Sequence, residues 1–443
     1  MRTTGIIKRR LVMSETDPLR HIPVHPNLRQ LKQQAKDLLQ LIRNKDPEAI
    51  EEFNQSHPSL KATNADTIKL NDAQLALARS YGIASWPRLV QTCNIIDAIW
   101  KNDLAAIREM ATKFPALIHE NARGTKNCNW GPPMSYAANL GRDEIIGMLH
   151  EMGAQDHAKA LDRATLQSKI DTARMIHNLM GKPRPPKDCL GGAAYTLSAS
   201  GTALMFELGA SVVDPSGNRL APVDIVLESD ARNPSAKHAI LEMYVQHGLV
   251  LPDTPTMALH RGRIDLLERH LQRDPYLLTR TFTHEEIYPS ELGCHTEIDA
   301  TQGTPLAGTT LLHLCADYDE LEIARWLLEK GMNVNERAVV DAAGFGGYTA
   351  LFGTVVSQPN FWMNLLHHEQ TAPLTRLLLE HGANPNARGS IKKQLHPGYA
   401  PKYDTKPYEY RNVTALSWGR QFHAKVFVSE PAMKLIEDSG GVE

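Results

Sequence analysis

The sequence predicts an all-α solenoid, in which short helix–turn–helix units stack side by side along the chain. Residues 310–335 contain two apolar stripes with three-to-four-residue spacing, and the polar residues 317–320 form a turn between them. Gly331 follows the second stripe, where a helix needs a left-handed residue to stop. Two helices of this length cannot bury their apolar faces alone, so the unit has to stack on copies of itself.

Copies of this unit are found on both sides of it. Residues 374–386 repeat the ending of the first unit, and residues 133–154 show the same order of apolar runs and glycines. Gly153, Gly181 and Gly209 follow one another at equal spacing. Because each repeat contacts only its neighbours and the array can grow freely, about nine such units account for the length of 443 residues.

The unit resembles the ankyrin repeat, whose signature is T-P-L-H-x-A, then a glycine, then L-L-x-x-G-A and N-A. Residues 310–315 read TLLHLC, with Leu311 in place of the usual proline, and Met332 later replaces an alanine. The resemblance implies an ankyrin-repeat solenoid with projecting hairpin fingers between repeats. It also implies that His313 hydrogen-bonds backbone groups of neighbouring repeats, and that a variable surface binds other macromolecules.

The repeat pattern divides the chain into four regions. Residues 1–26 lack an apolar stripe and are predicted to be a disordered tail. Residues 27–92 are predicted to form a helical cap, because an open solenoid needs a cover for its first apolar face. This cap resembles the N-terminal extension of bacterial ankyrin repeat proteins. Residues 93–307 form degenerate repeats, and residues 308–443 form clear repeats with insertions.

Composition and charge indicate a cytoplasmic protein. The net charge of −2 shows no overall excess of basic residues, so we expect no nucleic-acid partner. The five cysteines contain no C-x-x-C pair, which favours a reducing compartment and argues against a structural zinc site. No stretch approaches the ~18 apolar residues of a membrane span, so no membrane partner is expected. Phosphate-binding and dinucleotide motifs are missing, so we predict no cofactor.

Long insertions interrupt the repeats in the C-terminal half. Residues 281–308, 336–348 and 389–413 stand where the family has its fingers, and residues 357–371, which include two histidines, fall between the helices of one repeat. Bulky aromatic residues and prolines in the fingers indicate a contact surface, because loops that are merely solvated seldom contain them.

Acids, phenols and one base in these fingers form the predicted binding site. Fingers of consecutive repeats are neighbours, so we expect these side chains to lie together and at least one carboxylate to be buried with a displaced pKa. No catalytic residue is assigned. The candidate binding residues are Glu286, Tyr288, Glu291, Asp341, Glu409, Tyr410 and Arg411.

No metal site is predicted. His284, Glu291 and His295 are residue types that bind zinc, but Pro289 and Gly293 argue against the helix that would align them.

The favoured function is recognition of a protein partner on the concave, finger-lined side. The alternative is an enzyme or small-ligand-binding protein that uses the insertions 281–308, 336–348 and 389–413 as the walls of a polar acid–base site. A deep pocket with converging acids and bases would favour the alternative, whereas a broad surface would favour the partner.

Overall fold

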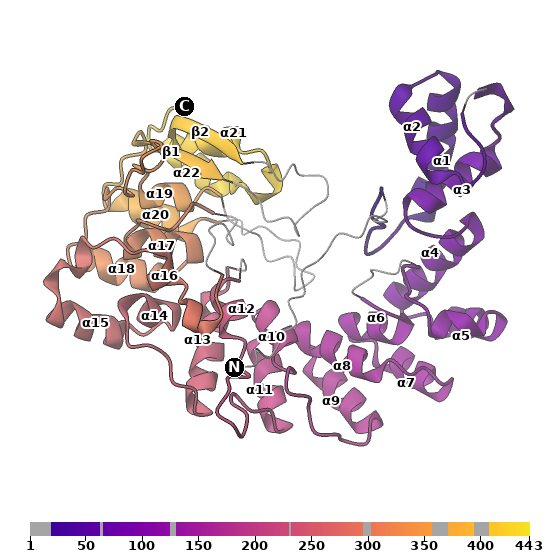
Figure 1. Cartoon of the computed structure of the whole chain (residues 1–443), viewed down its shortest axis with the longest axis horizontal. Coiled ribbons are helices and arrows are strands. Elements are labelled where there is room, and N and C mark those ends of the chain that lie inside the picture. Colours follow the sequence, from indigo (N-terminus) through magenta and orange to yellow (C-terminus); the bar gives the residue numbers. More distant parts are fainter. Residues whose placement is uncertain are drawn as a thin grey trace, which may run out of the picture. The chain divides into compact units, whose positions relative to one another are not determined.

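The computed structural model describes residues 19–62, 65–124, 130–229, 232–295, 303–356, 371–393 and 407–443. The chain divides into two compact units, each considered by itself: unit 1 is Met1–Ala164 with Lys169–Pro183, and unit 2 is Thr165–Ser168 with Arg184–Glu443. Almost all regular structure in the described part is helical (Figure 1), which confirms the prediction of a mainly helical chain. Residues 1–18 of the predicted tail and 357–370 of the fourth insertion lie outside the described residues.

The first part of the chain contains three helices followed by helix pairs. The two helices of the first two pairs contact each other, and α4 also contacts α6. The elements are α1 (Leu28–Arg43), α2 (Pro47–Ser56), η1 (Ala65–Thr67), α3 (Leu70–Ser80), α4 (Trp86–Lys101), α5 (Leu104–Lys113), η2 (Pro115–Ile118), α6 (Pro133–Leu140), α7 (Asp143–Glu151), α8 (His157–Leu166) and α9 (Ile170–Leu179).

Helix pairs continue through unit 2 and stack in order. First helices contact first helices, as in α14, α17, α19 and α21, and second helices do the same in α18, α20 and α22. The elements are α10 (Gly191–Tyr195), α11 (Ala199–Glu207), α12 (Val223–Leu227), α13 (Pro234–Gln246), α14 (Pro255–His260), α15 (Ile264–Arg273), η3 (Pro275–Leu278), α16 (His284–Ile287), η4 (Ser290–Leu292), α17 (Leu311–Tyr318), α18 (Leu321–Glu329), α19 (Ala350–Gly353), α20 (Pro373–Glu380), β1 (Arg388–Lys393), β2 (Tyr408–Thr414), α21 (Ala415–Gln421), η6 (Lys425–Phe427) and α22 (Glu430–Asp438).

The pair α17–α18 shows why the sequence folds into these units. Asp319 ends α17 with φ 60°, and Gly331 follows α18 with φ 95°, so left-handed residues stop both helices. Thr310 precedes α17, and its backbone N–H and hydroxyl donate to His313 Nδ1. His313 Nε2 donates to the Tyr348 carbonyl of the next repeat at 3.1 Å. The predicted structural role of this histidine is confirmed.

One finger departs from the all-α prediction. Strands β1 and β2 pair antiparallel, with Ile391 opposite Tyr410 and Lys393 opposite Tyr408. Ile391, Tyr410 and Val413 are buried, whereas Glu409 and Arg411 are exposed. A register shift between Gly389 and Ile391 interrupts the strict alternation of buried and exposed side chains in β2. The spacing of the helical repeats predicted only a finger at this position, because the pairing of two strands depends on segments that are distant in the sequence.

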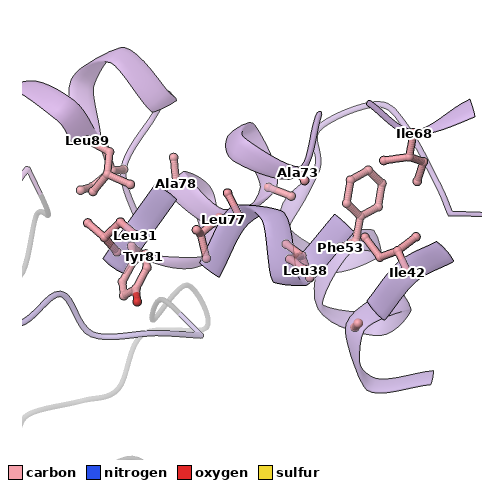
Figure 2. Packing of buried hydrophobic residues seen from close by; sticks show 14 of the residues in the cluster. Leu31, Leu38, Ile42, Phe53, Ile68, Ala73, Leu77, Ala78, Tyr81 and Leu89 are labelled. Carbon is pink, nitrogen blue, oxygen red and sulfur yellow. The ribbon is translucent and has the colours of Figure 1, made fainter. Parts of the chain in front are cut away.

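The predicted cap has its own apolar core. Side chains from α1, α2 and α3 pack together with Leu89 of α4 (Figure 2). Ile22 is also buried in this core, and Arg20 forms an ion pair with Glu52 at 2.6 Å. Part of the segment that the sequence assigns to the tail therefore contacts the cap.

Leu327 of α18 is fully buried, so its truncation should destabilise unit 2. We expect Leu327→Ala to lower the free energy of unfolding by ~2–5 kcal/mol, because the cavity adds to the lost burial. Chemical denaturation measures this, with Leu41→Ala as the control, since that leucine is 45% exposed. An unchanged midpoint for the Leu327 variant would contradict the assigned repeat register.

Removal of the cap should be far more damaging than removal of the preceding residues. A chain that begins at Val90 loses α1–α3 and exposes the apolar side of α4, so we expect aggregated or partly unfolded protein. A chain that begins at Leu19 retains Ile22 and should keep the unfolding midpoint of the full chain. Thermal melts and size-exclusion chromatography compare the two, and equal behaviour would argue against a capping role.

Candidate functional site

The connections between repeats of unit 2 form a row of hydrogen-bonded segments. Val339 N–H donates to the Gly308 carbonyl at 2.9 Å, which joins the first finger to the second. Gly346 and Ser390 exchange two backbone hydrogen bonds of 2.8 Å, which join the second finger to the third. We refer to residues 305–309, 336–348, 388–393 and 408–414 as the finger row.

The second and third fingers bring three of the predicted residues together. Asp341 accepts hydrogen bonds from the backbone of Ala343 and Phe345 and so fixes the tip of the second finger. The Arg411 guanidinium lies 4.2 Å from the centre of the Phe345 ring and donates to the Ala343 carbonyl. Glu409 accepts from Arg411 at 3.1 Å. The tip and the strand β2 thus form one charged surface.

Tyr410 belongs to the opposite face of β2. Its side chain is buried, and its hydroxyl lies 2.7 Å from His423 Nδ1. Burial raises the pKa of Tyr410 to about 12. Burial and the positive charge of Lys393 lower the pKa of His423 to about 4, so this ring is neutral at pH 7. Tyr410 therefore holds the hairpin in place and cannot touch a partner at the surface.

The predicted residues of the first finger lie apart from the other four. Glu286 caps α16, and its carboxylate binds Thr283 and Arg280. The backbone carbonyl of Glu291 accepts from Arg219 at 2.8 Å. Within the described part of the chain, no hydrogen bond or ion pair joins residues 286–291 to Asp341, Glu409, Tyr410 or Arg411. The contacts thus form two groups rather than one cleft.

Tyr288 is buried in a polar network on the first helices of unit 2. Its hydroxyl contacts the hydroxyl of Tyr318, which in turn donates to the Leu227 carbonyl at 3.3 Å. Lys237 of α13 lies 3.5 Å from the centre of the Tyr318 ring. The buried polar network comprises Arg232, Lys237, His238, His260, Tyr288, Asp317, Tyr318 and Glu320.

Asp317 and Glu320 are the carboxylates of this network, although the sequence predicts only a turn at both positions. Asp317 is fully buried at 3.1 Å from Arg232, and Glu320 lies 2.8 Å from His238. Burial raises the pKa of Asp317, and the charge of Arg232 offsets this only partly. The position of Asp317 could have indicated that it is buried, because it continues the three-residue spacing of the apolar residues Leu311 and Leu314.

Lys237 and His260 form a pair in which the pKa values of both side chains lie below their usual values. Lys237 Nζ lies 2.7 Å from His260 Nδ1, and His260 Nε2 donates to the Ile287 carbonyl at 3.1 Å. Since Nε2 carries the proton of a neutral ring, Nδ1 accepts from the lysine. Burial lowers the pKa of Lys237 to about 7 and lowers that of His260 well below 6.5. The pair joins the first insertion to α13 and α14.

The candidate zinc residues hold the first insertion in place instead of converging. His284 Nε2 donates to the His295 carbonyl at 2.8 Å, and His295 Nδ1 lies 2.6 Å from a Glu228 oxygen. Across the described ranges, no group of three or more histidine, cysteine, aspartate or glutamate residues is placed to hold a metal ion.

Replacement of Lys237 should change how stability depends on pH. Between pH 7 and about 10.5 the unfolded chain still binds the lysine proton and the folded chain has lost it, so raising the pH within this window should stabilise the wild type. Lys237→Met should remove a slope of up to about 1.4 kcal/mol per pH unit. Urea unfolding followed by tryptophan fluorescence at several pH values measures it.

The control for this experiment is Lys330→Met, because Lys330 forms a partly exposed pair with Glu268. This variant should keep the wild-type slope. Equal slopes in the wild type and the Lys237 variant would show that Lys237 has an ordinary pKa.

One segment of the chain matches a known family of repeats. The family model for the ankyrin repeat matches residues 307–339, which contain α17 and α18. Among solved structures, the chain is similar to the ankyrin repeat domain of human ASB11, with 15% identity, coverage of 70% of this chain and 99% of that one, and a TM-score of 0.24. It is also similar to the ankyrin repeat domain of Bcl-3, with 17% identity, coverage of 62% and 97%, and a TM-score of 0.21.

No curated protein matches the chain significantly. Within the residues that the structure describes, no helix has both the length and the apolar character that a membrane crossing requires.

Proposed function

Because the chain is an ankyrin repeat protein, we propose that it binds a protein partner, and that the finger row of unit 2 supplies the contact surface. The observation that carries this proposal is a pair of exposed valines on the second finger. Val339 and Val340 are 56% and 59% exposed. Burial of apolar surface is worth about 25 cal/mol per Å². Two adjacent exposed valines gain this free energy only when a partner covers them.

Charged residues on the next finger belong to the same finger row as the valines. Arg411, Glu409 and Lys392 are partly exposed on the neighbouring hairpin, and their ion pairs involve each other. Protein interfaces combine an apolar centre with a polar rim, and arginine is enriched in them. An exposed pair of this kind adds little stability on its own, so exchanging it for contacts with a partner costs little free energy.

Backbone geometry makes the second finger rigid before any partner arrives. Gly346 has φ 128°, and a Cβ atom there would lie 2.1 Å from the Val339 carbonyl oxygen. Only glycine allows this approach, and it holds the valine segment against the returning strand. A finger that is already ordered loses little conformational entropy on binding.

The contacts of the first insertion are the reason why we place the partner surface on the fingers and not on the concave face. Helix α16 contacts α14, and Tyr288 packs against Tyr318 of α17. These contacts cover the first helices at this position. The finger row remains the favourable place for a partner.

The alternative function, an enzyme or small-ligand-binding protein, is favoured by the displaced pKa of Lys237, because catalytic lysines need such a shift. It ranks second, because Lys237 is only 3% exposed and its contacts are made with His260 and Tyr318 of the same network. The network supports packing of the insertion better than access of a substrate.

A photo-crosslinking amino acid at position 340 tests the proposed surface. In cells that express the protein, we expect Val340 replaced by benzoyl-phenylalanine to capture a discrete protein, because that side chain would lie at the interface. The same amino acid at Arg325, which is exposed on α18, should capture none. Excess wild-type protein should suppress the product at least ~10-fold more than the double variant Val339→Asp, Val340→Asp, since about 1.4 kcal/mol corresponds to tenfold in affinity.

No crosslinked species at position 340, or the same species at both positions, would overturn the proposal. Equal competition by the wild type and the double variant would do so as well.

A further inference from the structure

A small pocket opens beside the first finger, where Glu286 is one of the lining residues. Its volume is about 210 Å³. Pro255, Leu277 and Phe282 supply an apolar part of the lining, and the last two are almost completely buried. Pockets that enclose drug-sized ligands measure roughly 300–1,000 Å³. This pocket is therefore sized for a single side chain of another protein.

The charged groups around the pocket are of mixed sign, with one more carboxylate than guanidinium. Three carboxylates, Asp253, Asp274 and Glu286, face two guanidinium groups, Arg273 and Arg280. A carboxylate can accept about four hydrogen bonds. A ligand can donate to it only where the protein has left some of this capacity unoccupied.

Asp253 is the carboxylate with unused capacity. Glu286 is held by Thr283 and by Arg280 at 2.5 Å, so it is well satisfied. Asp253 is 66% exposed, and its neighbours are more distant, with Arg273 at 3.4 Å and His270 at 3.2 Å. A strong new donor can therefore bind Asp253 without displacing a short hydrogen bond.

The rim of the pocket belongs to segments that present apolar side chains to solvent. Val250 and Tyr276 are 88% and 80% exposed, the highest values among the large hydrophobic residues described. Val250 precedes Asp253 by one short loop, and Tyr276 is adjacent to Leu277. Such exposure next to a pocket is typical of a protein interaction site.

The pocket is connected to the finger row through the backbone. Phe282, which lines the pocket, pairs with Thr309, and Gly308 accepts from Val339. Two strand-like spacings of about 4.8 Å place the exposed valines roughly 10 Å from this wall. One partner can contact both places.

We propose that this pocket receives an arginine side chain of the protein partner, with Asp253 accepting its guanidinium. The apolar stem of an arginine packs on Leu277 and Phe282, while its planar head matches a carboxylate with two parallel hydrogen bonds. The inference rests on the proposed function, because the arginine belongs to the protein partner.

The test uses a minimal probe, N-acetyl-arginine N-methylamide, titrated into the full chain and followed by saturation-transfer NMR. The isosteric but uncharged citrulline compound should bind at least ~10-fold more weakly, because hydrogen bonds to charged groups are worth more than neutral ones. Asp253→Asn should weaken binding of the arginine probe by at least ~10-fold. The lysine compound should also bind more weakly, since it lacks the planar fork.

Asp265→Asn is the matched control. Asp265 is 59% exposed, so it resembles Asp253 in exposure, but it is tightly paired with Arg263 at 2.7 Å and does not line the pocket. This variant should bind the arginine probe as the wild type does. Equal binding of the citrulline or lysine compound, no effect of Asp253→Asn, or an equal loss in Asp265→Asn would each overturn the inference.

Crosslinking at position 340 separates this inference from the proposed function. Specific capture at position 340 without binding of the arginine probe would leave the function standing and remove the pocket. Binding of the probe without capture would remove the finger row as the partner surface.

Discussion

Every part of unit 2 depends on the inability of two short helices to bury their apolar faces alone. Helix α17 has buried residues along its whole length, because α14 and α19 lie on either side of it. Stability in such an array comes from neighbour contacts, so a disturbance in one repeat spreads to the next. The fingers share this property, since Val339 and Gly346 each bond to a segment from a different connection.

The buried polar network adds a second constraint on how the insertion packs. Buried charges cost free energy unless they are paired, and unpaired ones are strongly destabilising. Here Arg232 meets Asp317, His238 meets Glu320, and Lys237 meets His260. These partners come from different repeats, so the pairs form only when the repeats are in register. The network selects one packing arrangement and contributes less to net stability.

The sequence predicted those features that depend on local period and chain order. Gly331 and the apolar stripe through Leu327 identified the helix pair, because both signals lie within one short segment. The order of the fingers predicted that the second and third fingers are neighbours, and Arg411 of the third contacts Ala343 and Phe345 of the second. Burial of Tyr288 was missed, because its sequence neighbours indicate a loop and its environment comes from α13, α14 and α17. Asp317 was missed for the same reason.

The two proposed contact elements together restrict the partner further than either does alone. An extended chain advances about 3.3 Å per residue, so the roughly 10 Å between the wall formed by Phe282 and the exposed valines corresponds to about three residues. In this proposal, an extended segment that crosses both carries an arginine and, a few positions away, an apolar residue. The close approach at Gly346 and the pairing of Phe282 with Thr309 hold the two backbone segments at a defined separation. Specificity then follows from the rigid spacing between a charge and an apolar contact, and less from the strength of either.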